Sequence, residues 1–300
     1  MLIIHLVILL ALPPLLLGVI GKTKAVFAGR RGPPLLQAYR DIAKLLRKAL
    51  VISETTSWIF QAAPAVTLVA VFLAGLLVPF GPSPAPLAFS GDMILFAYLF
   101  GLSRFFTTAA ALDTGSAFEG MGSAREATFA CLTEPALFLV FIALAKETGS
   151  LSLTKMLRSG SLLFDAAAAP PLVLVCIGLF IVLLSENSRI PVDDPCTHLE
   201  LTMIHEAMIL DHSGPLLGLI EYSASMKLLV LESVLVTLAL PFGSGVAAID
   251  SCIFVAETLV LAMAIGVVES VMARLRMRRV PYLLTGALLL CGSGFILIVR

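Results

Sequence analysis

Charged residues are scarce in this sequence. Asp, Glu, Lys and Arg make up 13% of its 300 residues, whereas soluble domains carry about 25%. The 20 acidic and 20 basic residues cancel, so no general attraction to nucleic acid is expected. The composition excludes an ordinary soluble domain, and the 59% of hydrophobic residues indicates a chain that lies in lipid.

Motifs for metal binding and covalent catalysis are also missing. The five cysteines are scattered and form no CxxC pair, so neither an iron–sulfur site nor a disulfide framework is expected. His205-Glu206 could begin a zinc-protease helix, but residue 209 is Ile where the second histidine would stand. There is no GxSxG nucleophile turn and no internal repeat of the kind that secondary transporters show. A membrane hydrolase and a stand-alone ion transporter are therefore the less favoured alternatives.

Long apolar blocks predict an all-α integral membrane protein. About eight blocks approach the roughly 20 residues that a helix needs to cross the hydrocarbon core. They cover residues 2–20, 58–79, 93–112, 128–145, 166–185, 223–240, 251–268 and 280–299. The first block lacks the basic start and small-residue cleavage site of a signal peptide, so we expect a retained first helix. Residues 1–300 are expected to form a single membrane domain.

The basic residues orient these helices. All but four of the 20 lie nearer one side, the exceptions being Lys146, Lys155, Arg158 and Arg300. By the positive-inside rule, the loops 21–57, 113–127, 186–222 and 269–279 are then cytoplasmic. We expect both termini outside, in a multi-pass protein of the inner (cytoplasmic) membrane.

Residues 35–50, in the first cytoplasmic loop, predict an amphipathic surface helix. One face is apolar and carries Leu35, Tyr39, Ile42, Leu46 and Ala49. The other is mainly basic and carries Gln37, Arg40, Asp41, Lys44, Arg47 and Lys48. Such a helix is expected to lie among the headgroups of an anionic leaflet. A docking surface for a soluble partner subunit is the alternative.

Three glutamates interrupt the apolar blocks: Glu134, Glu232 and Glu257. A charge at the centre of a bilayer costs about 2.5–3.5 kcal/mol on insertion scales. Each glutamate should therefore face the bundle interior, a partner subunit or water. An ion pair, for example with Lys227 in the sixth block, is the alternative to a functional role.

Acids and histidines concentrate in the 186–222 loop. Asp194-Pro195 predicts the start of a helix that runs to about residue 210 and ends at Gly214-Pro215. Its histidines recur every seven residues, at His198, His205 and His212. Neighbours at this spacing lie about 10.5 Å apart along a helix, too far to share one metal ion. Proton handling or polar packing is the favoured interpretation.

Several motifs together resemble one family. ENSRIPVDDP, from Glu186, resembles its Glu/Arg/Pro/Asp signature after the fifth helix, and Glu221-Tyr222 resembles its Glu-Tyr entering the sixth. Arg125 and Glu134 match its arginine-then-glutamate spacing, and GRRGPPLLQ, from Gly29, is similar to its first loop. Over essentially its whole length the chain resembles the membrane subunit shared by respiratory complex I and the membrane-bound hydrogenases.

Within this family the chain is most similar to the formate hydrogenlyase and hydrogenase-4 branch, notably from Pro191 to Pro215. Complex I proteins carry further acids where Cys196 and His198 stand here, and they have a GPN-type first loop. These departures favour partners that reduce protons or another acceptor. A quinone-binding subunit of an NADH dehydrogenase-type complex is the alternative.

The resemblance implies coupling by a non-catalytic subunit of an ion-translocating oxidoreductase complex. It implies a proton path at Glu134, Glu186, Asp193, Glu200 and Glu221. Supporting positions are Arg189 and Arg125, which would pair with these acids, and Glu206, Asp211, His198 and His205. Implied partners are soluble hydrogenase-like large and small subunits, iron–sulfur proteins and antiporter-like membrane subunits, but no nucleic acid. We expect no cofactor or metal on this chain; iron–sulfur clusters, with or without nickel–iron, would belong to the partners.

Overall fold

The computed structural model describes residues 2–158, 169–193, 203–240 and 243–299, and these form helices joined by loops and turns, without strands. The longer helices are α4 (Trp58–Leu77), α5 (Asp92–Asp113), α6 (Ala117–Thr148), α8 (Ala169–Glu186), α10 (Gly214–Ala239), α11 (Ala247–Val271) and α12 (Val280–Val299). The shorter ones are α1 (Leu2–Ala11), α2 (Pro13–Phe27), α3 (Gln37–Leu46), α7 (Leu153–Arg158) and α9 (His205–Met208). Within the described chain, seven helices are long and apolar enough to cross a membrane, or up to eight if α1 and α2 count as one span. The predicted all-α membrane fold is confirmed.

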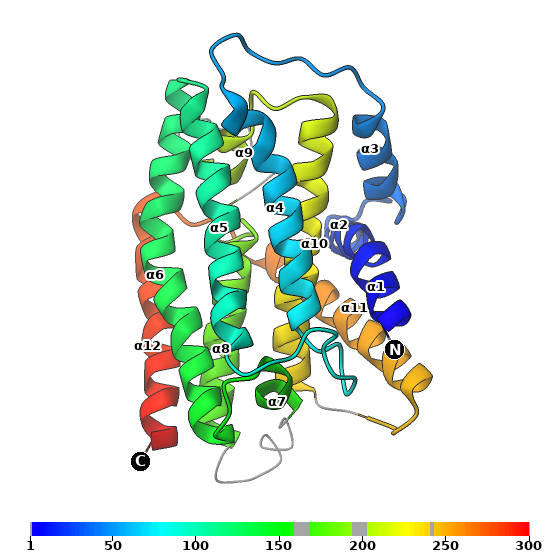
Figure 1. The fold of residues 1–300 in the computed structure, drawn as a ribbon, viewed down its shortest axis with the longest axis vertical. Coiled ribbons are helices and arrows are strands. Elements are labelled where there is room, and N and C mark those ends of the chain that lie inside the picture. The colour runs from blue at the N-terminus through cyan, green and yellow to red at the C-terminus, as the bar shows by residue number, and fades with distance from the viewer. Residues whose placement is uncertain (1, 159–168, 194–202, 241–242, 300) are drawn as a thin grey trace.

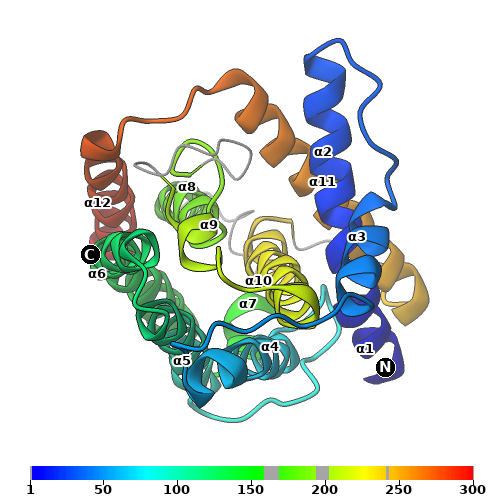
Figure 2. The ribbon, with the colours of Figure 1, turned by 90° about the horizontal axis from the view of Figure 1, so that it is seen from above.

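Helix α10 forms the centre of the bundle. It packs against α2, α3, α4, α8 and α11, and 78% of its most apolar 18-residue window is buried. Seen from above, α5, α6 and α12 lie on one side of it, and α1, α2 and α11 lie on the other (Figures 1 and 2). Polar residues on α10 are therefore held inside the protein.

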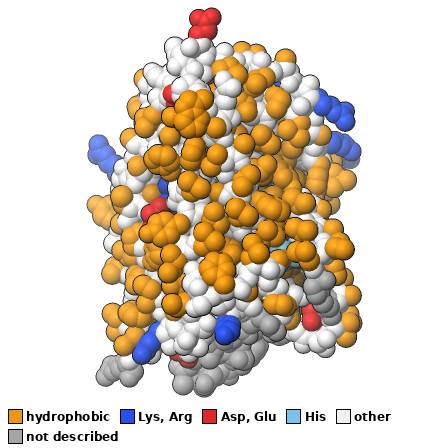
Figure 3. All heavy atoms as spheres, in the orientation of Figure 1, with side chains coloured by type: hydrophobic (Ala, Val, Ile, Leu, Met, Phe, Trp, Pro, Cys, Tyr) orange, Lys and Arg blue, Asp and Glu red, His pale blue; other side chains and the backbone are white. Residues whose placement is uncertain are grey.

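The outer surface is mainly apolar. Hydrophobic side chains cover the face shown in Figure 3, and charged side chains are sparse there. Inside, small residues allow helices to approach closely. A Cβ added at Gly178 of α8 would lie 2.4 Å from Cys291 Sγ of α12, and one at Gly294 of α12 would lie 2.7 Å from Val175 Cγ2. This close contact fixes α12 against α8.

The first predicted span is broken. Helices α1 and α2 meet at an angle of 45°, because Pro13 and Pro14 follow Leu12 and have no N–H to continue the helical hydrogen bonds. Two tyrosines cap carbonyls at the break. The Tyr222 hydroxyl donates to the Leu10 carbonyl at 2.7 Å, and the Tyr39 hydroxyl donates to the Ala11 carbonyl.

Two helices begin earlier than predicted. Most of the predicted 113–127 loop is wrong, because α6 begins at Ala117. Gly214-Pro215 does not end a helix but begins α10, where proline is tolerated because first-turn N–H groups have no helical partner. Gly214 has φ +51°, and a Cβ there would lie 2.6 Å from the Ala49 carbonyl oxygen.

The helix predicted within the 186–222 loop is described only from residue 203 onward. Of its described part, only α9 (His205–Met208) is helical before α10 begins. The predicted start at Asp194-Pro195 lies outside the described residues.

The predicted surface helix is α3, which is shorter than the expected 35–50. It has no fully buried residue and segregates apolar from polar side chains. It packs against α2 and α10, where a Cβ at Gly218 would lie 3.2 Å from Leu45 Cβ. Its exposed position agrees with an interfacial location, which stays a prediction, as does the orientation of the bundle.

Candidate functional site

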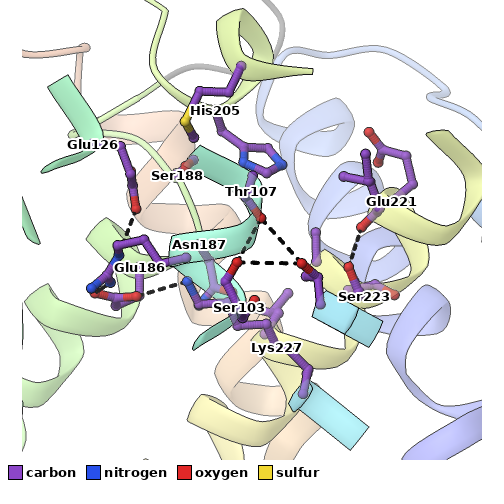
Figure 4. Close-up of a pocket in the computed structure, with 18 of the residues that line it drawn as sticks. Ser103, Thr107, Glu126, Glu186, Asn187, Ser188, His205, Glu221, Ser223 and Lys227 are labelled. Carbon is purple, nitrogen blue, oxygen red and sulfur yellow. Dashed lines mark hydrogen bonds and ion pairs between the residues drawn. The ribbon is translucent and has the colours of Figure 1, made fainter. Parts of the chain in front are cut away.

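A cavity of about 300 Å³ lies beside α10 inside the bundle, and most residues around it are polar or charged (Figure 4). Its lining carboxylates are Glu126, Glu186, Asp193, Glu206 and Glu221, and its lining cations are Arg104, Arg189 and Lys227. Hydroxyl groups line it as well, including those of Thr67, Ser103, Thr107 and Ser223. Donors and acceptors of this density can hold water and move protons.

Arg104 of α5 is the centre of a charge network. Its guanidinium pairs with Glu126 at 3.1 Å and Glu186 at 2.5 Å, and also with Glu134. The second Glu186 oxygen lies 2.8 Å from Lys227 Nζ. These five side chains, which we call the Arg104 network, join α5, α6, α8 and α10. When all are ionised, three carboxylates face two cations, so the network can accept one proton and become neutral.

The carboxylate of Glu186 is buried and is contacted by a hydroxyl group as well as by two cations. Its side chain is 6% exposed, and the Thr133 hydroxyl donates to it at 2.9 Å. Glu186 is the last residue of α8, and the chain then turns sharply, with Ser188 at a φ of +49°. The turn directs Glu186, Arg189 and Asp193 toward the same cavity.

A second group of charges lies on the other side of this turn. Glu269 of α11, whose side chain is fully buried, pairs with Lys24 of α2 at 2.8 Å and with Arg189 at 3.5 Å. Asp193 pairs with Arg274 at 3.0 Å. We call these five residues the Glu269 cluster. When all are ionised, three cations face two carboxylates, and Arg189 and Asp193 connect the cluster to the cavity.

Asp193 also organises the segment before α9. Its Oδ2 accepts the backbone N–H groups of Ile204 at 3.0 Å and His205 at 3.2 Å. Charge-assisted bonds of this kind are stronger than those between neutral groups. They hold His205 and Glu206 in the cavity wall.

The predicted proton-path residues are partly brought together. Glu186, Asp193 and Glu221 line the cavity, and Figure 4 shows Glu221 across it from Glu186. Glu134 reaches the site only through Arg104, and 47% of its side chain is exposed. Glu200 lies outside the described residues.

The predicted supporting residues divide in the same way. Within the described chain, the ion pair of Arg189 is with Glu269 rather than with an acid of the predicted path. Arg125 donates to the Met203 carbonyl at 2.7 Å. Asp211 is exposed, and its N–H donates to Glu119 at 3.0 Å, away from the cavity. His198 lies outside the described residues.

The histidines do not form a common site. His205 lines the cavity, whereas His212 is buried and stacks on Phe60 with ring centroids 3.9 Å apart. Burial lowers the pKa of His212 from 6.5 to about 4, so its ring is neutral near pH 7. Among the residues that the structure describes, no three His, Cys, Asp or Glu side chains are placed to hold a metal ion.

The three glutamates within apolar blocks have three different environments. Glu134 is paired with Arg104. Glu232 is completely buried in α10, and neither carboxylate oxygen has a hydrogen-bond partner. Glu257 of α11 is half-buried, and its Oε1 has no partner. Lys227 pairs with Glu186 rather than with any of these three glutamates, and Glu134 is the one of the three that has an ion pair among the described residues.

Sequence reasoning did not single out Arg104, Glu126 or Glu269. Arg104 lies within the third apolar block, so the cost argument applied to the glutamates would have found it. The predicted spans leave Glu126 and Glu269 in loops, because the span 128–145 begins after α6 does and the span 251–268 ends before α11 does.

Comparisons with known proteins agree with this architecture. The family described as NADH dehydrogenase matches residues 1–300. Formate hydrogenlyase subunit 4 of Escherichia coli is 31% identical over 284 residues, covering 93% of this chain and 91% of that protein. Hydrogenase-4 component C of Escherichia coli is 31% identical over 274 residues, covering 89% and 85%.

A solved structure shows the same fold. A chain of the membrane-bound sulfane sulfur reductase, an archaeal respiratory membrane complex, superimposes with a TM-score of 0.84 at 20% identity, covering 99% of this chain and 98% of that one. The chain therefore belongs to the NADH dehydrogenase subunit 1/H family, and it is a multi-pass membrane subunit of a complex I-like or hydrogenase-like respiratory complex.

Proposed function

We propose that this chain is a coupling subunit that relays protons through the Arg104 network toward antiporter-like membrane subunits when a soluble redox arm turns over. The observation that carries the proposal is the position of the network. Three carboxylates and two cations lie on four helices, beside a polar cavity and inside an otherwise apolar bundle.

The network has both an entrance and an exit. On the cavity side, Glu206 and His205 lie in the short segment before α10, which faces the predicted cytoplasm. On the outer side, Glu134 carries the network to the surface of α6, where 47% of its side chain is exposed. In this proposal, a proton accepted at the cavity reaches that surface through the carboxylates that pair with Arg104. The outer face of α6 is therefore where we place an antiporter-like neighbour.

A redox arm can drive this relay electrostatically. Carboxylates held in a low dielectric respond strongly to a nearby change of charge. Arrival of an electron in a docked iron–sulfur protein adds a negative charge near the cavity mouth and favours proton uptake there. The reduced partner keeps the redox chemistry, and this chain moves protons only.

The docking face follows from the same geometry. The start of α6, α9 and the 47–57 segment lie at the end of the bundle that we predict to be cytoplasmic (Figure 1), and the basic 274–279 segment enters α12 partway down the bundle. The relatives' names, formate hydrogenlyase, hydrogenase-4 and sulfane sulfur reductase, support soluble hydrogenase-like and iron–sulfur partners at this end. They also support a place in the cytoplasmic membrane.

The test is Glu186→Gln in the assembled complex. Glutamine keeps the size and hydrogen bonding of glutamate but cannot be ionised. We expect acceptor reduction by the detached soluble arm to be unchanged and ion translocation per electron in vesicles to fall at least tenfold. Glu147→Gln is the matched control, because Glu147 lies in the last turn of α6, at the opposite end of the bundle.

Two results would contradict the proposal. Unchanged translocation in Glu186→Gln would make the Arg104 network structural. Purification of this chain as an active ion-transporting homomer would favour the stand-alone transporter instead.

A further inference from the structure

Helix α11 carries a carboxyl group in mid-span that this chain leaves unsatisfied. Glu257 lies ten residues after Ala247, the first residue of α11, which places it roughly 15 Å from the start of the helix. Its side chain is half-buried, and Oε1 has no hydrogen-bond partner. Among the described residues, none of the ion pairs includes Glu257.

The position of Glu257 on α11 is at the border of an exposed stripe. One side of α11 packs against α2 and α10. The opposite side is open along most of the helix and carries Ile249, Cys252, Ala256, Val260, Met263, Val267 and Val271. Glu257 stands between Ala256 and Val260 on the edge of this stripe, which we call the α11 stripe.

Hydrocarbon offers this carboxyl group no hydrogen-bond donor. A glutamate side chain is too short to reach the headgroups from mid-span, unlike the long side chains of Lys and Arg. Glu257 lines neither the central cavity nor the second cavity between α1 and residues 80–86. The enclosed Oε1 has no partner among the described residues, and the exposed part of this half-buried residue can be neutralised only by a group outside the described chain.

The buried glutamates of the other helices support this argument by contrast. Glu134 and Glu186 are matched by cations of the same chain, and Glu232 is fully enclosed. Only Glu257, among these four, is both without a cation and open to the outside of the bundle. The apolar residues around it fit a helix, because small and branched side chains such as those of Ala256 and Val260 allow close approach.

We propose that the α11 stripe is the interface with a transmembrane helix of a neighbouring subunit, which brings a lysine or arginine to Glu257. A basic group is the complement of a carboxylate, and bringing the two together removes the cost of each in lipid. The interface does not depend on the proton relay, because α11 contributes to that site only through Glu269.

Substitution at Glu257 distinguishes a protein partner from lipid, because the two predict opposite changes in the recovery of the complex. Glu257→Leu places an apolar side chain in mid-span. If a cation faces it, that cation loses its partner, and we expect the amount of one membrane subunit that co-purifies with this chain to fall at least about tenfold. If lipid faces it, leucine is preferred there, and equal or greater recovery of the whole complex would overturn the proposal. Glu257→Gln should lose less than Glu257→Leu, because it still accepts a hydrogen bond.

A photoreactive side chain in place of Val260, which is 54% exposed, tests the same interface in the assembled complex while Glu257 is left unchanged. We expect a covalent adduct with another membrane subunit, and the cross-linked peptide should come from a span with Lys or Arg within two helical turns. The adduct should disappear in the Glu257→Leu background. Adducts with lipid only, with a second copy of this chain, or with a span without a basic residue would each overturn the proposal.

Discussion

The pair between Lys227 and Glu186 gives a direct measure of how much the Arg104 network contributes to stability. Lys227→Met keeps the length and apolar stem of the side chain but removes its charge. The parent distance is 2.8 Å, and the two side chains are 19% and 6% exposed. Glu186 would keep Arg104 and Thr133 but lose its second cation.

The expected loss can be worked from this geometry. At an effective dielectric constant of about 20, opposite charges 2.8 Å apart attract by roughly 6 kcal/mol. The cost of removing the ammonium group from water offsets part of this attraction, and breaking a buried pair generally costs about 3–5 kcal/mol. At about 2–4 °C per kcal/mol for a chain of this size, Lys227→Met should lower Tm by roughly 6–20 °C.

A double-mutant cycle with Glu186→Gln shows whether the loss belongs to this pair. Once Glu186 is neutral, Lys227 no longer has that partner, so the two substitutions together should cost less than their sum by about 2 kcal/mol or more. The assay is thermal unfolding of the purified complex in one detergent, at one salt concentration. A Lys227→Met variant within about 2 °C of the parent, or additive effects in the cycle, would refute the reasoning.

Three further outcomes follow from the structure. Burial lowers the pKa of His212 to about 4, so between pH 6.5 and 4 the unfolded chain binds a proton that the folded chain does not. The parent therefore loses roughly 3 kcal/mol of stability as the pH falls through this window. His212→Leu should remove this part of the pH dependence of Tm, and a Tm-against-pH profile equal to that of the parent would contradict the argument. Gly178→Val should destabilise by about 1–3 kcal/mol, because a Cβ there meets Cys291 Sγ at 2.4 Å, and Cys291→Ala should restore part of the Tm. Tyr222→Phe removes the 2.7 Å hydrogen bond to the Leu10 carbonyl and should cost about 0.5–1.5 kcal/mol, whereas an unchanged Tm would show that the carbonyl is satisfied in another way.

The sequence predicts several spans well because the hydrophobicity of a block directly indicates whether that block lies in lipid. Residues 58–79, 93–112 and 280–299 differ from α4, α5 and α12 by at most two residues at either end. The signal is local in these cases, since a lipid-facing helix must be apolar over its whole width.

The predicted helix ends are wrong where a polar group is hydrogen-bonded by a segment distant in the sequence. Glu119, in the first turn of α6, is fully buried and accepts the N–H of Asp211. Hydropathy assigns such a residue to a loop, because its neighbours in the sequence do not show that it has a hydrogen-bond partner 92 residues away. The start of α10 was missed for the same reason, since the hydroxyl of Ser213, its N-cap residue, accepts the Val51 N–H and donates to the Val51 carbonyl.

Of the Arg104 network, Glu134 and Glu186 were predicted as site residues, whereas Arg104 and Glu126 were not. Glu186 and Asp193 stand in a recognisable motif, whereas the choice of Arg104 over Arg189 as the partner of Glu186 depends on how α5, α6 and α8 pack. Motif resemblance carries no information on that packing. A sequence can therefore name the groups of a charge network before it can pair them.

The pairing itself explains how so many charges remain in an apolar bundle. The Arg104 network has one excess carboxylate, and the Glu269 cluster has one excess cation, so the two together are neutral when all are ionised. The two groups together therefore carry no net charge, although each alone carries one. A proton that enters the Arg104 network upsets this balance, leaving the pair of groups with one positive charge. In the relay that we propose, the balance is restored when a proton leaves, and the half-exposed Glu134 on α6 is the proposed exit.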